Sequence, residues 1–126
     1  MTPIRVVTAA LALVLVLVGL WALLGPHSFY DDAATYPPYN RHFIHDIGAF
    51  ALGLGACLAA GVLLPDALLA VLGGGTVFGV AHFAAHVADR DLGGSASDPY
   101  AFGGVALVFA ALTLARWKGS GAHPLI

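Results

Sequence analysis

Two short histidine motifs stand out in an otherwise apolar chain. His82 and His86 are four residues apart, and His42 is followed three residues later by the pair His45-Asp46. Residues three or four apart lie on one face of a helix, so each motif would present its polar side chains together. Imidazole nitrogens and carboxylate oxygens bind transition metals, and they also exchange protons near neutral pH. Both kinds of chemistry therefore have to be considered.

The first hypothesis is a metal or haem site to which both motifs contribute. Zinc, copper or iron would accept this nitrogen and oxygen chemistry, and two histidines on facing helices would suit a haem. Further side chains would serve as alternative ligands or would hold an imidazole in one tautomer. The predicted ligands are His45, Asp46, His82 and His86, with His42 and Asp89 as the alternates.

Two other hypotheses need no metal. In the first, Asp46, His82 and His86 are the catalytic candidates of an acid/base enzyme whose substrate dissolves in the membrane. In the second, the cluster only supplies hydrogen bonds that fix the register of neighbouring helices. The protein would then be a non-catalytic accessory or structural subunit of a membrane complex. The sequence leaves all three hypotheses open.

The composition predicts a membrane protein. Hydrophobic residues make up 60% of the 126 residues and charged residues only 10%, whereas a soluble domain carries about a quarter charged residues. A helix needs about 20 apolar residues to cross a bilayer, and four stretches are long enough: 4–25, 42–64, 66–88 and 99–117. We therefore expect an all-α, four-helix transmembrane bundle with antiparallel neighbours, forming a single domain over 1–126.

The partners expected for such a chain follow from its charge. A net charge of −2 without a basic run argues against nucleic acid as a partner. The lipid bilayer is the expected partner, with a homo-oligomer or a larger membrane complex as further alternatives.

The segments between the spans also carry signals. Asn40 is a typical capping residue for the second span, and Leu64-Pro65-Asp66 leaves room only for a tight hairpin between the second and third spans. The stretch 25–40 is expected to be a loop. Within it, the stiff aromatic segment from Tyr36 to Asn40 would act either as an interfacial anchor or as a lid over the histidine site.

We expect the second and third spans to face each other along their whole length. On each span the small residues and the polar residues share one stripe, and patterns such as Gly75-x-x-x-Gly79 let helix backbones approach closely. Polar side chains are costly against lipid and should turn inward. Counted from Pro65, both histidine motifs then lie at matching depth, within about one helical turn.

The orientation is predicted from the basic residues that flank the spans. Arg5, Arg116 and Lys118 lie on one side, and Arg41 and Arg90 lie on the other. Because cytoplasmic segments carry more Lys and Arg, both termini are expected in the cytoplasm of a bacterial cell. The histidine site would then lie in the outer leaflet of the plasma membrane.

The layout resembles the DoxX-like group of small bacterial four-span membrane proteins. The similar features are Gly25-Pro26 at the close of the first span, Pro38-Tyr39-Asn40 before the second, its Gly-rich continuation and the Pro65 hairpin. The resemblance implies a small multi-pass protein of a bacterial membrane. Members of the group tend to carry an Arg at the start of the second span. Here His45-Asp46 occupies that region, and the arginine, Arg41, lies ahead of it. The resemblance therefore assigns no role to any residue.

Overall fold

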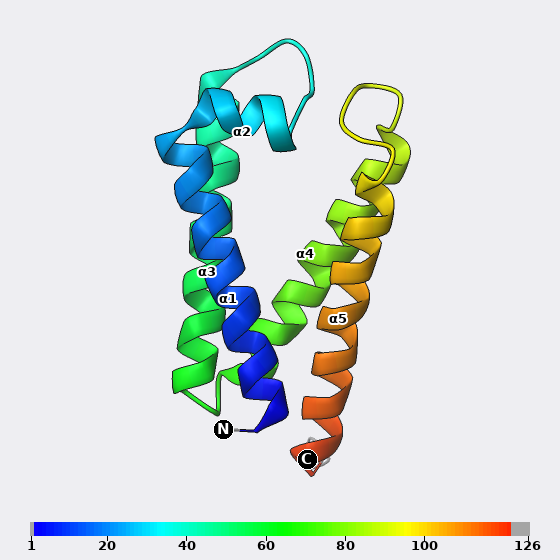
Figure 1. The fold of residues 1–126 in the computed structure, drawn as a ribbon. Coiled ribbons are helices and arrows are strands. Elements are labelled where there is room, and N and C mark those ends of the chain that lie inside the picture. Colours follow the sequence, from blue (N-terminus) through cyan, green and yellow to red (C-terminus); the bar gives the residue numbers. More distant parts are fainter. Residues whose placement is uncertain (1, 122–126) are drawn as a thin grey trace.

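A computed structural model describes residues 2–121 and places five helices in that range (Figure 1). The long ones are α1 (Pro3–Leu24), α3 (Arg41–Leu63), α4 (Leu68–Ala88) and α5 (Asp98–Gly119), and α2 (Pro26–Ala33) is short. Each predicted span matches one long helix, with ends that differ by at most two residues. The all-α fold class is confirmed. The sequence analysis missed α2, which lies in the stretch expected to be a loop.

Local signals in the sequence explain where several helices begin and end. The Asn40 side chain accepts a hydrogen bond from the Phe43 backbone N–H at 3.2 Å, which satisfies one of the free donors at the start of α3. Proline fixes φ and needs no hydrogen-bonded N–H, so Pro3, Pro26 and Pro99 suit the first turns that they occupy. Only residues 64–67 then connect α3 to α4, and the predicted hairpin at Pro65 is confirmed.

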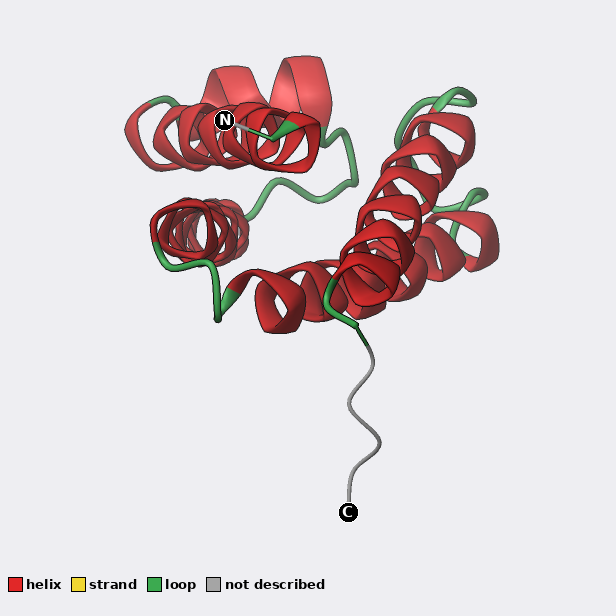
Figure 2. Ribbon diagram, turned by 90° about the horizontal axis from the view of Figure 1, so that it is seen from below, coloured by secondary structure: helices red, strands yellow, loops and turns green. Residues whose placement is uncertain are grey.

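The long helices form two antiparallel pairs, α1 with α3 and α4 with α5 (Figures 1 and 2). Both ends of the described chain and the α3–α4 turn lie at one end of the molecule, here called the turn end. The opposite end, with α2 and the segments 34–40 and 89–97, is called the loop end. The two pairs meet at the turn end and diverge toward the loop end (Figure 1).

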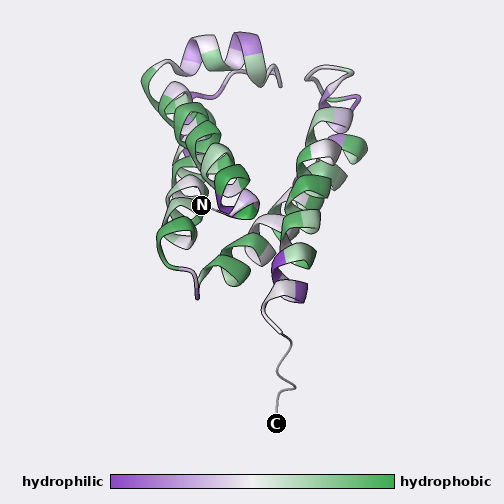
Figure 3. Ribbon diagram, turned by 60° about the horizontal axis from the view of Figure 1, so that its bottom comes forward, coloured by the Kyte–Doolittle hydropathy of each residue, from purple (hydrophilic) through white to green (hydrophobic). Residues whose placement is uncertain are grey.

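The surface of the four long helices suits a lipid environment. Each is long and apolar enough to cross a membrane, with a mean hydropathy of 1.5 to 2.7 over its most apolar stretch. Hydrophilic residues gather at the helix ends and in α2 and the connecting segments (Figure 3). Only 11–33% of those apolar stretches is buried inside the chain, so most of this surface is available to acyl chains. The chain is a multi-pass integral membrane protein.

Glycine allows close contact within each helix pair. Between α1 and α3, a Cβ on Gly48 would lie 3.0 Å from the Gly19 carbonyl oxygen, and one on Gly55 would lie 3.0 Å from that of Ala12. Between α4 and α5, a Cβ on Gly75 would lie 2.5 Å from the Phe109 ring. With little hydrophobic drive between helices in lipid, such close packing is a main source of association.

The predicted face-to-face packing of the second and third spans was wrong. The helix α3 turns Gly48 and Gly55 toward α1, and its predicted contact stripe is exposed at Ala49, Gly53, Ala56 and Ala60. The predicted Gly75-x-x-x-Gly79 pattern does mediate close packing, but its partner is α5. The α3–α4 hairpin therefore joins two helix pairs that diverge from the turn, rather than forming a pair itself.

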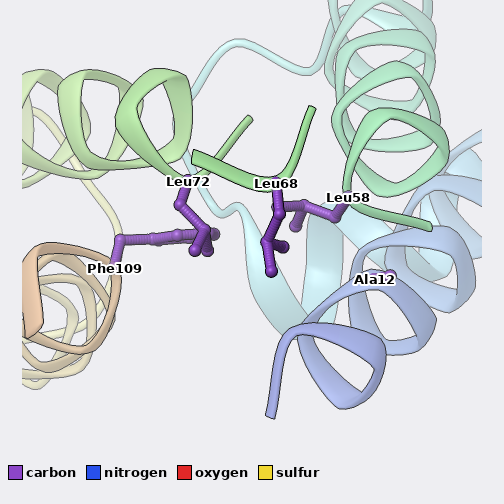
Figure 4. Packing of buried hydrophobic residues seen from close by; sticks show 5 residues of the cluster. All are labelled: Ala12, Leu58, Leu68, Leu72 and Phe109. Carbon is purple, nitrogen blue, oxygen red and sulfur yellow. The ribbon is translucent and has the colours of Figure 1, made fainter. Parts of the chain in front are cut away.

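A small apolar core holds the two pairs together at the turn end. Leu58 of α3, Leu72 of α4 and Phe109 of α5 are almost fully buried in it, beside Ala12 and Leu68 (Figure 4). A second cluster at the loop end packs Phe29 of α2 against α1 and α3. Phe29 is only 5% exposed, so it anchors α2 on the first pair.

Candidate functional site

The histidines of α4 form a contacting pair close to the loop end. The Nε2 atoms of His82 and His86 lie 3.0 Å apart, a distance at which one ring donates a hydrogen bond to the other. The spacing of four residues brings the rings onto one face of α4. A neutral imidazole has one donor and one acceptor nitrogen, so this contact fixes the two tautomers relative to each other.

An aromatic ring of α5 holds both imidazoles in place. Phe102 stacks on His82 with ring centroids 4.2 Å apart and on His86 with centroids 4.1 Å apart. Phe78 adds an edge contact to His82 from one turn earlier on α4. Stacked and edge contacts of this kind restrict how a ring can turn. The packing of α4 on α5 thus orients the pair.

The second nitrogen of His86 faces two oxygen atoms from distant parts of the chain. Its Nδ1 lies 3.1 Å from the Tyr36 hydroxyl and 3.8 Å from Asp98 Oδ2. The Asp98 carboxylate is held in position because the same Oδ2 accepts a 2.8 Å hydrogen bond from the Ser95 backbone N–H. Side chains of His86 and Asp98 are only 12% and 18% exposed. A protonated His86 would therefore find its counter-charge at a mostly buried position.

Tyr36 reaches His86 because residues 34–40, here called the strap, run from α2 to α3 and contact the segment between α4 and α5 on the way. The Gly94 N–H donates a 2.8 Å hydrogen bond to the Thr35 carbonyl oxygen. Gly94 has a positive φ of 77°, and a Cβ there would lie 2.6 Å from the Tyr36 hydroxyl. A side chain at this position would therefore be strained in its backbone and would displace Tyr36.

A cavity of about 550 Å³ borders this cluster. Tyr36, His86 and Asp98 form part of its wall, so the second nitrogen of His86 is placed next to space that a small molecule can occupy. Both apolar and charged side chains line it. The other lining residues are Phe83, Val87, Arg90, Asp91, Gly93, Ser95, Ala96, Pro99 and Tyr100.

These contacts form one continuous path for a proton. If Tyr36 donates to His86 Nδ1, then His86 Nε2 carries the hydrogen that it donates to His82. If His86 Nδ1 carries the hydrogen instead, Nε2 accepts one from His82. The two arrangements differ in the tautomer of both rings, because each hydrogen bond of the path reverses its direction. If every proton of the path moves to the next partner, the cluster relays one proton between the cavity wall and His82.

Tyr36 should remain a phenol well into the alkaline range. Burial raises the pKa of Tyr36 above 10.0, and the carboxylates of Asp98 and Asp89 raise it further. Because folding raises the pKa of Tyr36, its neutral phenol stabilises the folded state. This contribution is present below the unfolded pKa of 10.0 and is lost as the pH rises through the higher pKa of the folded state. We expect the difference in phenolate absorbance between wild type and Tyr36→Phe to appear only above pH 10. A midpoint below pH 10 would contradict this environment.

No protein-family model, curated protein or solved structure matches this chain. The resemblance to the DoxX-like group therefore stays a prediction. The chemistry of the site has to be judged from the geometry of the chain itself.

The structure brings together only half of the predicted ligand set. Asp46 lies 3.7 Å from His42, one turn away on α3, and both side chains are largely exposed. His45 Nε2 is buried and has no hydrogen-bond partner among the described residues. Within that range no hydrogen bond or ion pair joins either His45 or Asp46 to the α4 pair. The divergence of the helix pairs toward the loop end explains the separation.

The alternate ligand Asp89 lies near the site, whereas the predicted metal site is not formed by the described residues. Asp89 caps the end of α4 and affects the site through the charge that it presents to Tyr36. Among residues 2–121, no three His, Cys, Asp or Glu side chains converge in a way that would hold a metal ion. The metal and haem hypotheses thus gain no support from the arrangement of the ligands, and they stay predictions.

Three members of the cluster were missed as site residues or given another role. Asp98 and Phe102 were not among the predicted site residues. Tyr36 was considered as a lid, and its contact with His86 agrees with that alternative. The available signal for Asp98 was its place at the start of the fourth span. There it meets the end of the third span whenever these two helices pair.

Proposed function

We propose that this membrane protein carries an acid/base site that exchanges a proton with a small molecule bound at one membrane face. The proton is held by the His82–His86 pair, and the molecule occupies the cavity beside His86. Tyr36 and Asp98 act as the hydrogen-bonding and charged partners of His86. This is the metal-free hypothesis, with Asp98 in the place first expected for Asp46.

One observation supports the proposal above all others: both nitrogens of His86 are engaged, one with His82 and the other with groups in the cavity wall. A pair needed only for packing would not have to reach a cavity. Ionisable groups inside a membrane-spanning helix are costly, which makes function the default hypothesis for them. Proton exchange would be the function that accounts for the ionisable pair in this helix.

The orientation of the site is part of the proposal. The turn end carries Arg5, Arg116 and Lys118, which favours the cytoplasmic side for that end. The site would then lie near the outer surface of a bacterial plasma membrane. The accessory-subunit and metal alternatives stay predictions. The exposed small residues of α3 would suit a helix of another subunit.

Nuclear magnetic resonance of histidine-labelled protein in lipid nanodiscs tests the proton path. The ¹⁵N shifts of the ring nitrogens report protonation and tautomer, and single His→Gln variants assign them. We expect His82→Gln to change the tautomer of His86, because the contact between the two Nε2 atoms fixes the two tautomers relative to each other in the wild type.

A matched control is available on α3. His42 is 86% exposed and lies outside the cluster, so His42→Gln should leave the ¹⁵N shifts of His86 unchanged. Tyr36→Phe should change the tautomer of His86 because its hydroxyl partner is removed. The proton path is wrong if the ¹⁵N shifts of His86 stay the same in the His82→Gln protein while both proteins remain folded.

A further inference from the structure

The charges of the chain are divided unequally between its two ends. Six of the seven aspartates, but only two of the five basic residues, belong to the loop end. Six aspartates against two arginines leave a formal charge of −4 there. The turn end holds the other three basic residues and Asp66. A solute near the loop end therefore meets a negative field, which favours cations over anions.

The charged residues of the cavity wall also favour a cation over an anion. Asp91 and Asp98 are acidic members of its wall, and Arg90 is the basic one. The Arg90 side chain is 74% exposed, and its Nε lies 3.8 Å from Asp91 Oδ1, so the charges of Arg90 and Asp91 largely offset each other. Asp98, at 18% exposed, is the charge least screened by solvent. The net charge that the wall presents to a ligand is therefore negative.

The rest of the wall is suited to an apolar body. Tyr36, Phe83 and Tyr100 supply aromatic rings, and Val87 and Pro99 supply aliphatic surface. Aromatic faces attract organic cations through their quadrupole, and they also bury hydrocarbon. Small ions such as Na⁺ would gain nothing from these side chains. The combination fits a molecule with both a positive charge and an apolar part.

We infer that the cavity binds an organic ammonium ion with an apolar body, in exchange for the proton held by the histidine pair. The inference rests on the proposed proton site, to which it adds the class of ligand. The groups facing His86 are His82 on α4, Tyr36 of the strap and Asp98 of α5. An ammonium ion beside Asp98 takes the place of the imidazolium charge, so cation and proton compete.

The raised pKa of Tyr36 agrees with this negative environment. After burial, its causes are the carboxylates of Asp98 and Asp89, which disfavour a phenolate at the cavity wall. The same two charges that oppose an anion at Tyr36 would attract a cation placed next to it.

The exchange is balanced without a further reactant. When the cation binds, the N–H bond of the imidazolium breaks, its electron pair stays on the ring nitrogen, and the proton passes to a buffer base. When the cation leaves, the nitrogen takes a proton back. One positive charge replaces another beside Asp98, so the mostly buried carboxylate always has a counter-charge.

Calorimetry on the full chain in zwitterionic nanodiscs, with empty nanodiscs as blank, tests the inference. The probes are benzyltrimethylammonium, which has a charge but no proton to give, benzyl alcohol and benzoate. We expect the cation to bind at least tenfold more tightly than the alcohol and benzoate not to bind. Its Kd should rise as the pH falls from 8 to 5, by up to tenfold per unit. Two buffers of different ionisation enthalpy should show up to one proton released per cation.

Variants separate the charge from the aromatic contribution. Asp98→Asn keeps an oxygen for the Ser95 N–H but removes the charge, and it should weaken binding by about tenfold. Tyr100 is 83% exposed, so Tyr100→Leu should fold normally and weaken binding several-fold. Asp66→Asn, at the turn end, is the matched control and should leave the Kd unchanged.

The outcomes distinguish the two proposals. Equal binding of the cation and benzoate, or no effect of either Asp98→Asn or Tyr100→Leu, overturns the assignment of an ammonium ligand, even where proton uptake still depends on His82. Cation binding that is independent of pH and releases no proton supports the ligand class but overturns the proton exchange. Tight binding whose pH dependence is lost in His86→Gln supports both.

Discussion

Gly19→Ala is expected to lower the free energy of unfolding by about 2 kcal/mol, because the new methyl group has no space between α1 and α3. A Cβ there would lie 2.8 Å from both the Gly48 carbonyl oxygen and the Leu52 backbone nitrogen. Backbone atoms of a packed helix cannot move aside separately, so the two helices would have to separate. Gly75→Ala should behave similarly, since the Phe109 ring at 2.5 Å is only 1% exposed.

Matched glycines in the same helices provide the controls. Gly53 of α3 and Gly74 of α4 have no atom within 4 Å of an added Cβ. Alanine at either position should be neutral or stabilise by about 0.5 kcal/mol, because it restricts the unfolded chain and favours helix. Unfolding in detergent followed by circular dichroism would measure all four variants. Equal stabilities for Gly19→Ala and Gly53→Ala would show that α1 does not pack on this face of α3.

The helices themselves could be predicted because each depends on a signal within its own residues. A run of about 20 apolar residues has few alternatives to a membrane-spanning helix. Asn40 and Pro65 mark their boundaries by local chemistry that needs no knowledge of the neighbours. The short α2 escaped notice because its main stabilising contact, the burial of Phe29, comes from helices elsewhere in the chain.

The partners of each helix could not be predicted in the same way. On α3, Gly48 and Gly55 form one small face, and Gly53 and Ala56 form part of another. Either face allows close approach, and the sequence of α3 alone does not decide between them. The choice depends on the surface that α1 offers, where Gly19 and Ala12 match the first face. The prediction assigned the helix contact to the face with Gly53 and Ala56. It therefore placed His45 and Asp46 beside the histidines of α4, which was wrong.

In the candidate site, too, one part could be predicted from local sequence and another part could not. The contact between His82 and His86 follows from their spacing on one helix, and it was predicted. Asp98 and Tyr36 join them only because α5 pairs with α4 and the strap contacts this second pair. Their contribution depends on tertiary structure, so their residue types gave no sufficient signal. Asp46 is near a histidine as expected, but that histidine is His42 of its own helix.

The pairing of α4 with α5 predicts which pairs of engineered cysteines can form a disulfide. A Cβ on Gly79 would lie 3.3 Å from Ala106 Cβ, close to the separation of about 3.5–4.5 Å that a disulfide requires. We expect Gly79→Cys with Ala106→Cys, in a Cys57→Ala background, to oxidise in most molecules under mild conditions. Counting free thiols with a maleimide–polyethylene glycol reagent would measure the yield as a shift in gel mobility.

The same background allows the rival arrangement to be tested directly. If the second and third spans faced each other along their length, His45→Cys with His82→Cys would place two thiols at one depth on facing helices. The observed pairs put these positions on helices that diverge toward the loop end, so this double variant should keep both thiols free. A high yield for the second pair and none for the first would restore the four-residue site. The reverse result confines the proton chemistry to α4, α5 and the strap, because only these elements then reach His86.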